Sequence, residues 1–195
     1  PVIEDVDGKI WIGSTKGLAS YSFQTKEFNY FSFVKKTGDV IDGVNITALF
    51  KDSKENIWVG TTVGLFSFNA ESNRFEEAQF VTGSDRKFSF DNTCIRTITE
   101  DKNGNLIIGT EGRGLFVLST NSQNPVTVQN YTTENSEIGD DIVQSLIIDR
   151  SENLWIGNLQ GISKTDLKKK KFNIYRRSNS PNSINLLGNV IASLY

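Results

Sequence analysis

The sequence contains no histidine, and this absence excludes several classes of catalytic site. Ser-His-Asp triads, Cys-His pairs and histidine metal ligands all need an imidazole, so none can be built from these 195 residues. The single cysteine, Cys94, cannot form an intramolecular disulfide. A reactive thiolate needs a cationic neighbour, and only Arg96 is close in sequence. We therefore expect Cys94 to be an inert structural thiol.

Long apolar runs are also missing, and proline occurs only three times. Neither a transmembrane helix nor a signal peptide is therefore predicted within this segment. The net charge of −2 provides no field that would attract nucleic acid or an anionic membrane. The one dense basic run, Lys168–Lys171, is typical of a solvated hairpin edge. We expect no nucleic-acid partner and no direct membrane contact.

What the sequence does contain is one short motif in four copies. The copies begin at Asp5, Asp52, Asp101 and Asp149 and end in an apolar triplet that includes glycine. Their anchors are Trp11, Trp58, Ile107 and Trp155, at intervals of 47, 49 and 48 residues, followed by Gly13, Gly60, Gly109 and Gly157. A fixed period of this length indicates units that bury their apolar faces only by stacking on neighbours.

Each copy reads as four short strands joined by tight turns. Apolar residues alternate or form runs of about five, without helical spacing. The second turn always ends in glycine, at Gly17, Gly64, Gly114 and Gly161. A four-stranded antiparallel meander repeated at this period is one blade of a β-propeller. The fold class predicted is all-β: a partial propeller of about four blades, part of a larger, seven-bladed ring.

The phase of the repeats divides residues 1–195 without a linker. The predicted blades cover residues 1–34, 44–80, 93–131 and 141–177, and residues 189–195 open a fifth. Continuing the register places another aspartate about two residues beyond Tyr195 and another anchor near position 203. The sequence also lacks methionine. We therefore expect a piece of a longer chain whose remaining blades are partners of these.

The recurring aspartates could suggest a metal site, but turn chemistry explains them better. Only the first copy has a second aspartate, Asp7, and the later ligand positions of a calcium loop are missing. An aspartate at the same place in every blade is expected to accept hydrogen bonds from backbone amides. We predict no catalytic residue, no cofactor and no metal ligand in this segment.

The connections between blades are the best candidates for binding, because long loops on a rigid scaffold often carry function. They cover residues 35–45, 81–93, 132–141 and 176–189. In a propeller they would share one face with the glycine-ended turns. Aromatic and charged side chains are suited to binding a sugar or a peptide. The ligand-contact candidates on this basis are Arg86, Phe88, Phe90, Asp91 and Arg113. Packing of some of these aromatics against a blade is the alternative.

The four copies, cleanest at residues 52–65, resemble the two-component regulator propeller repeat found in sensor regions of hybrid two-component systems of Bacteroidetes. The resemblance covers essentially the whole chain, although Ile107 replaces tryptophan and Asn158 stands where Thr61 does. It implies a parent with two seven-bladed propellers on the periplasmic side of the inner membrane. A transmembrane helix and a histidine kinase would follow, and the parent would sense oligosaccharides as a dimer. The repeat motif itself carries no ligand-binding residue.

Three functions are therefore open. The first is a non-catalytic segment of an extracytoplasmic sensor, with a glycan as ligand. The second is a segment of a propeller lyase or hydrolase, for which the acidic residues of one loop would serve: Glu134, Glu137, Asp140 and Asp141. The third is a protein-interaction scaffold. The shortage of catalytic residue types favours the first.

Overall fold

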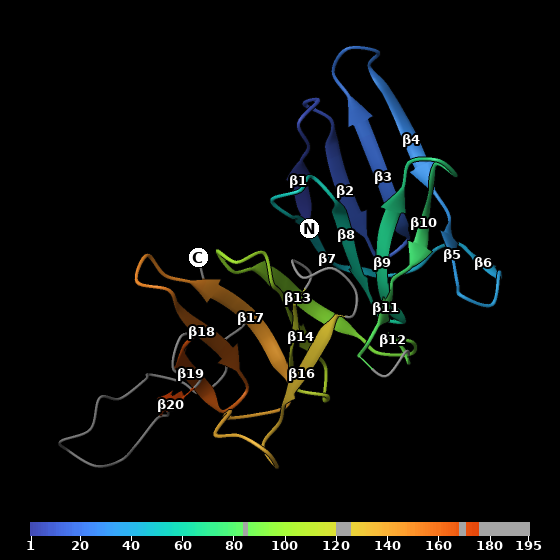
Figure 1. Ribbon diagram of the computed structural model, residues 1–195. Helices are drawn as coiled ribbons and strands as arrows, with labels where there is room; N and C mark the ends of the chain where they lie inside the picture. Colours follow the sequence, from blue (N-terminus) through green and yellow to red (C-terminus); the bar gives the residue numbers. More distant parts are fainter. Residues whose placement is uncertain (84–85, 120–125, 168–170, 176–195) are drawn as a thin grey trace.

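The computed structural model describes residues 1–83, 86–119, 126–167 and 171–175. These residues form four larger sheets and one small hairpin, and Figure 1 shows the larger sheets following one another in chain order. No helix occurs in these ranges, so none is long and apolar enough to cross a membrane. The all-β propeller architecture predicted from the repeats is confirmed. Residues 176–195, including the predicted opening of a fifth blade, lie outside the described residues.

The first, third and fourth larger sheets are antiparallel meanders of four strands each. The first sheet consists of β1 (Val2–Glu4), β2 (Ile10–Ser14), β3 (Gly17–Ser22) and β4 (Glu27–Phe31). The third consists of β13 (Ile95–Glu100), β14 (Leu106–Thr110), β15 (Leu115–Ser119) and β16 (Thr127–Tyr131). The fourth consists of β17 (Val143–Ile148), β18 (Asn153–Asn158), β19 (Gly161–Asp166) and β20 (Lys171–Tyr175).

The second sheet differs from the others because it gains two short strands. Its meander is β7 (Ile46–Lys51), β8 (Ile57–Thr61), β9 (Gly64–Asn69) and β10 (Arg74–Glu77). β5 (Phe33–Val34) pairs in parallel with β10, and β6 (Val40–Ile41) pairs with β5. Residues 33–34, which the repeat phase assigned to the first blade, therefore pair with the second sheet. Such a parallel pairing has no local sequence signal.

The run from Arg74 to Phe80, which reads as one strand in the sequence, is divided in the structure. β10 ends at Glu77, and β11 (Gln79–Val81) pairs with β12 (Lys87–Ser89) in a separate two-stranded sheet. The division follows from packing, because Ala78 and Phe80 are buried among core residues of the next sheet. Part of the predicted connection 81–93 is therefore a β-hairpin.

Buried side chains fill the spaces between consecutive sheets and explain why the strands lack polar alternation. Along β8, Ile57 and Val59 belong to the core shared with the first sheet, whereas Trp58 packs against the core shared with the third. Along β14, Leu106 and Ile108 point to one side and Ile107 to the other. Both faces of an interior sheet are buried, so its strands read as continuous apolar runs.

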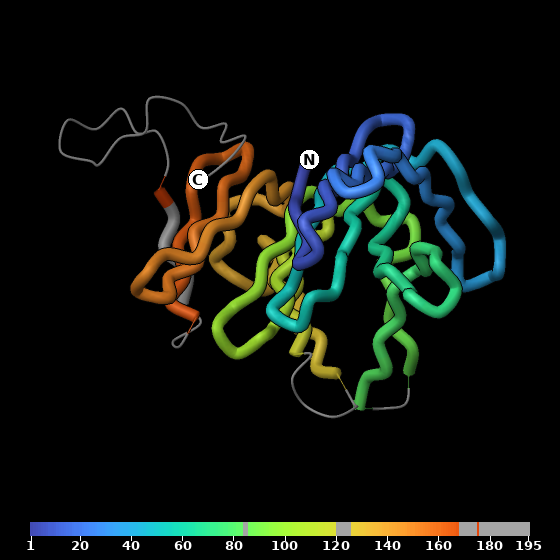
Figure 2. Tube along the Cα trace, turned by 90° about the horizontal axis from the view of Figure 1, so that it is seen from above, coloured from blue at the N-terminus to red at the C-terminus, as the bar shows by residue number. Residues whose placement is uncertain are grey.

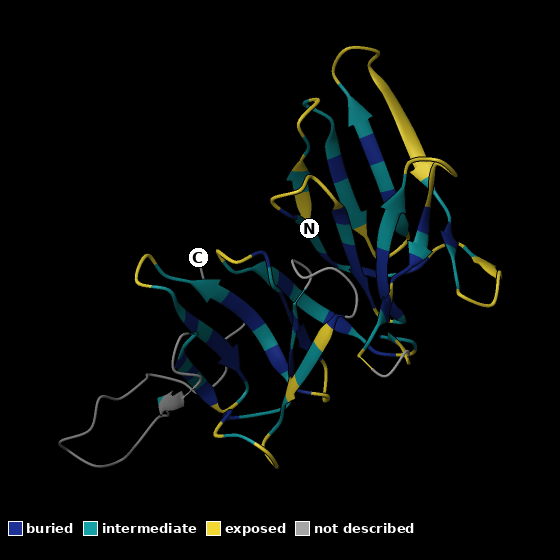
Figure 3. Cartoon of the chain, viewed as in Figure 1, coloured by how far each residue is buried: buried dark blue, intermediate teal, exposed yellow. Residues whose placement is uncertain are grey.

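The first strands of successive sheets lie next to one another, as β7, β13 and β17 do. Each has a register irregularity near its start, at Ile46, Ile95 and Val143. Figure 2 shows β5 and β6, the outer strands of the second sheet, on the side of the molecule opposite the fourth sheet. On the first sheet, β4 is largely exposed, as Figure 3 shows.

Candidate functional site

The four aspartates occupy equivalent positions in turns between the first and second strands. The Asp52 carboxylate accepts hydrogen bonds from the backbone N–H groups of Lys54 at 2.9 Å and Asn56 at 2.8 Å. Its Oδ2 atom also accepts the Asn56 amide and the Trp58 indole N–H, each at 2.8 Å. One carboxylate thus organises the turn and orients the anchor. These are the turn bonds expected of such an aspartate.

The indole bond recurs in three of the four sheets. Trp11 donates to Asp5 and Trp155 to Asp149, each at 2.8 Å. In the third sheet Asp101 accepts the Asn105 amide at 2.7 Å, but its anchor is Ile107, which has no donor. In each of these turns the residue before the last one has a positive φ. Glycine occupies this position in two copies, and Glu55 (φ 68) and Glu152 (φ 65) occupy it in the other two. The sequence did not suggest that glutamate takes this conformation.

The hydrogen bonds at Asp149 make its carboxyl group a stronger acid. The Trp155 indole N–H, followed by the Asn153 and Ser151 groups, holds the pKa of Asp149 well below its usual range. A folded-state pKa below the unfolded value means that the stability is present above about pH 4 and is lost as pH falls. We expect Asp149→Asn to destabilise the chain at pH 7 and to flatten its acid-side decline. Urea unfolding between pH 7 and pH 2 measures both; parallel pH profiles of the two proteins would contradict the assignment.

The connections and the glycine-ended turns meet on one face, as expected. The Asn92 N–H donates to the carbonyl of Val63, and the N–H groups of Gly112 and Gly114 donate to the carbonyl of Asp141. Each turn is thereby tied to the connection that leads into the next sheet. We call this surface the connection face: residues 35–45, 81–83, 86–93 and 132–141 with the turns ending at Gly17, Gly64 and Gly114.

The structure separates the five candidate ligand contacts rather than joining them. Phe90 is completely buried and packs edge-on against Phe116 at 5.0 Å, so its side chain belongs to the core. Phe88 is half-buried against the same ring at 5.8 Å. Arg113 lies over Phe116 at 5.5 Å and donates to the Thr93 hydroxyl at 2.6 Å. Packing therefore accounts for the aromatic candidates.

The remaining two candidates are more accessible. The side chain of Arg86 is exposed, and its carbonyl accepts hydrogen bonds from the backbone N–H and the hydroxyl of Thr82. Asp91 forms ion pairs with Lys35 at 3.0 Å and Lys36 at 3.1 Å, and these lysines hold its pKa below the usual range. Asp91 thereby joins two connections that are distant in sequence. The lysine partners were not predicted, because nothing local links them to residue 91.

A pocket of about 240 Å³ opens beside these lysines. Lys35, Lys36, Glu76, Glu77 and Gln79 line it together with Val34 and Gly38. The Glu77 side chain is 6% exposed; its Oε2 atom accepts the Lys36 backbone N–H at 3.1 Å, whereas Oε1 has no hydrogen-bond partner among the described residues. A buried carboxylate oxygen with free acceptor capacity favours a ligand that donates hydrogen bonds.

Cys94 is unsuited to nucleophilic chemistry. Burial and a hydrogen bond with Glu111 raise the pKa of its thiol to about 11, although Arg96 opposes the shift. Arg96 is instead paired with Glu111 at 2.8 Å. We expect alkylation of Cys94 by iodoacetamide at pH 8 to be roughly hundredfold slower in the native than in the unfolded chain. Mass spectrometry of the Cys94 peptide measures this, and equal rates would contradict it.

The acidic residues considered for an enzyme are partly committed to the loop itself. Asp140 accepts the Ile142 backbone N–H at 2.8 Å, and Asp141 accepts the Thr133 N–H at 2.7 Å. Carboxylates that cap backbone groups in this way stabilise the loop. The basic run at residues 168–170 lies outside the described residues.

Comparisons with known proteins agree with the repeat. The family model described as "Two component regulator propeller" matches residues 41–62 and 89–112. No match was found among curated proteins.

The solved structures extend the likeness to all four sheets. The chain is similar to the extracellular domain of the hybrid two component system BT3049 from B. thetaiotaomicron: 22% identity, TM-score 0.70, 100% of this chain and 24% of that one. The extracellular domain of BT4673 from the same organism is 17% identical with a TM-score of 0.61, and the match covers 100% of this chain and 31% of that one. PorZ, a surface component of the type-IX secretion system of Porphyromonas gingivalis, is 18% identical with a TM-score of 0.65. The match covers 85% of this chain and 30% of PorZ.

The chain therefore spans less than a third of the length of each of these structures. At such identities the structural likeness establishes the fold, while the family match establishes the repeat. Together with the four copies of the motif, they identify the chain as a run of four β-propeller blades, within which residues 41–62 and 89–112 match the two component regulator propeller model.

Proposed function

We propose that the chain is a non-catalytic part of the extracytoplasmic sensor region of a hybrid two-component signalling protein. The observation that carries this proposal is the superposition of the whole chain on the BT3049 extracellular domain at a TM-score of 0.70. The parent would be a membrane-anchored histidine kinase on the periplasmic side of the inner membrane, acting as a dimer. The other blades of its ring would complete the propeller.

The ligand we propose is an oligosaccharide bound at the connection face, beside Glu77. Sugar hydroxyls donate to carboxylates and amides and accept from ammonium groups, and the Glu77 pocket offers all three. Glu77 supplies a free acceptor oxygen, Gln79 an amide, and Lys35 and Lys36 ammonium donors. Asp91 fixes the two lysines by ion pairs, and the pocket presents these lysines beside the carboxylates of Glu76 and Glu77.

The test is a titration of the complete extracytoplasmic region with a panel of defined plant and host oligosaccharides, with binding measured by isothermal calorimetry. We expect one glycan to bind and Glu77→Gln to weaken it about tenfold, because a bond to a charged acceptor is lost. Lys54→Ala is the control, since Lys54 is exposed in the Asp52 turn. Absence of binding to every sugar, together with capture of a specific protein, would replace this proposal by the interaction scaffold.

A further inference from the structure

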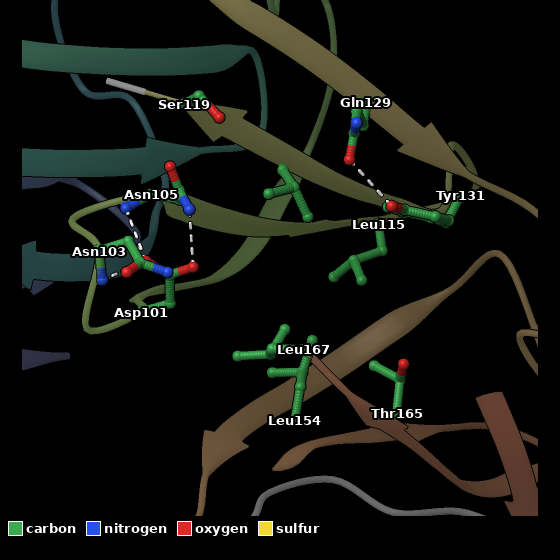
Figure 4. Close-up of a pocket in the computed structure, with 11 residues that line it drawn as sticks. Asp101, Asn103, Asn105, Leu115, Ser119, Gln129, Tyr131, Leu154, Thr165 and Leu167 are labelled. Carbon is green, nitrogen blue, oxygen red and sulfur yellow. Dashed lines mark hydrogen bonds between the residues drawn. The ribbon is translucent and has the colours of Figure 1, made fainter. Parts of the chain in front are cut away.

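A second cavity lies between the third and fourth sheets, well apart from the Glu77 pocket in sequence. Its volume is about 200 Å³. Figure 4 shows its polar side formed by the Asp101 turn and its opposite side by the fourth sheet. The residues that matter for its chemistry are Asp101, Val117, Tyr131, Leu154, Thr165 and Leu167. Carboxylate, amide, hydroxyl, phenol and aliphatic groups therefore meet in one partly open space.

The first and second sheets show what fills the corresponding space elsewhere in the molecule. There the Trp11 indole packs against Phe31 at 4.9 Å, Phe68 at 5.7 Å and Phe75 at 5.6 Å. Trp11 is 2% exposed. Its N–H group points at the aspartate of its own turn, Asp5. An indole is thus the group for which this interblade space is shaped.

Two small residues leave the space unfilled between the third and fourth sheets. Ile107 stands at the anchor position and lacks the indole. Thr165 is the fifth residue of β19, where Phe68 is the fifth residue of β9, so the opposite wall is also reduced. Tyr131 keeps the place of Phe31, since each pairs with the leucine after the turn glycine. Thr165 lines the cavity, whereas Ile107 is fully buried and does not line it. Neither side chain is as large as its aromatic counterpart.

The hydrogen-bonding capacity of the space is retained although the indole is not. Asp52 Oδ2 accepts two donors, the Asn56 amide and the Trp58 indole. Asp101 Oδ2 accepts the equivalent amide of Asn105 at 2.7 Å and no indole. Burial raises the pKa of the Tyr131 phenol, which lines the same space. An acceptor beside aliphatic walls suits a flat ring with one N–H group.

We propose that this cavity binds a small planar aromatic molecule carrying an N–H donor, of the size and polarity of indole. The ring would lie between Val117 and Leu154, and its N–H group would donate to Asp101 Oδ2. The cavity is large enough, because an apolar cavity of roughly 150 Å³ already binds benzene. The site lies between two blades, so its ligand would stabilise their stacking.

The test is isothermal titration of the full chain with indole. We expect saturable binding that Ile107→Trp abolishes by filling the cavity from the third sheet. Thr165→Phe fills it from the fourth sheet and is expected to abolish binding independently, which keeps the test decisive if one variant fails to fold. Val6→Trp, which adds a tryptophan at a position 65% exposed, is the control and should bind as the parent chain does.

The probe itself tests the role of Asp101. 1-Methylindole has the same ring but no N–H donor, so we expect it to bind at least about tenfold more weakly than indole. Equal binding of the two compounds would overturn the hydrogen bond to Asp101. Absence of indole binding, or binding that persists in both filled variants, would overturn the site.

Discussion

Replacing Gly109 by alanine is expected to lower the free energy of unfolding by about 3 kcal/mol, a large effect for one added methyl group. Gly109 follows directly on Ile108 in β14 and faces the first strand of the next sheet. A Cβ atom there would lie 2.6 Å from Thr97 Cγ2 and 2.9 Å from Val143 Cβ. Rotation of Val143 cannot relieve the second contact, because a Cβ atom is fixed by the backbone.

The same close approach occurs at each preceding interface, so the effect belongs to the repeat. A Cβ atom at Gly13 would lie 2.8 Å from Ile46 Cβ, and one at Gly60 would lie 3.0 Å from Ile95 Cβ. Ile46, Ile95 and Val143 are the residues at the register irregularity of their strands. The irregularity brings each of these β-branched side chains against the glycine of the sheet before it.

Gly17→Ala is the matched control for Gly109→Ala. Gly17 has a φ of 124°, but no atom lies within 4 Å of its added Cβ. Only backbone strain applies there, and we expect a loss of about 1–2 kcal/mol. Urea unfolding followed by circular dichroism compares the two variants. If Gly109→Ala cost no more than Gly17→Ala, the close approach of the next sheet would not explain the glycine of the motif.

The periodicity of the sequence was sufficient to predict the blades, because their strands are joined by local turns. The aspartate, the anchor and two glycines lie within one copy, and short-range hydrogen bonds connect them. The pairing of β5 with β10 could not be predicted, because the two strands are about forty positions apart and no single turn connects them. Lys35 and Asp91 are a further example, because they are 56 positions apart.

The two cavities differ in how far the sequence could reveal them. Ile107 stood out as the one anchor that is not tryptophan, so the sequence alone showed that the third copy lacks the indole N–H donor. Its other wall depends on Thr165, whose significance emerges only when consecutive sheets are stacked. Glu77 carried no signal, because a glutamate in a strand is ordinarily solvated and its burial follows from the added strands β5 and β6.

The second large effect is expected at the aspartate of the same repeat. Asp52→Ala should lower the free energy of unfolding by about 3 kcal/mol, because four donors lose one acceptor. Asp52 is 7% exposed, so water replaces those bonds poorly. The loss should combine a turn contribution with a contribution from the partly buried indole of Trp58.

A double-mutant cycle separates these contributions, since Trp58→Phe keeps an aromatic ring and removes the N–H donor, and the packing lost with the smaller ring cancels in the cycle. We expect a coupling of about 1.5–3 kcal/mol between the Asp52→Ala and Trp58→Phe changes, as for a hydrogen bond to a charged group. Asp101→Ala combined with Ile107→Val gives the matched cycle without an indole and should show almost no coupling through this bond. Equal coupling in both cycles would mean that the aspartate stabilises only its turn. A difference would mean that the motif links turn geometry to blade packing, and this link explains why aspartate and tryptophan recur together six residues apart.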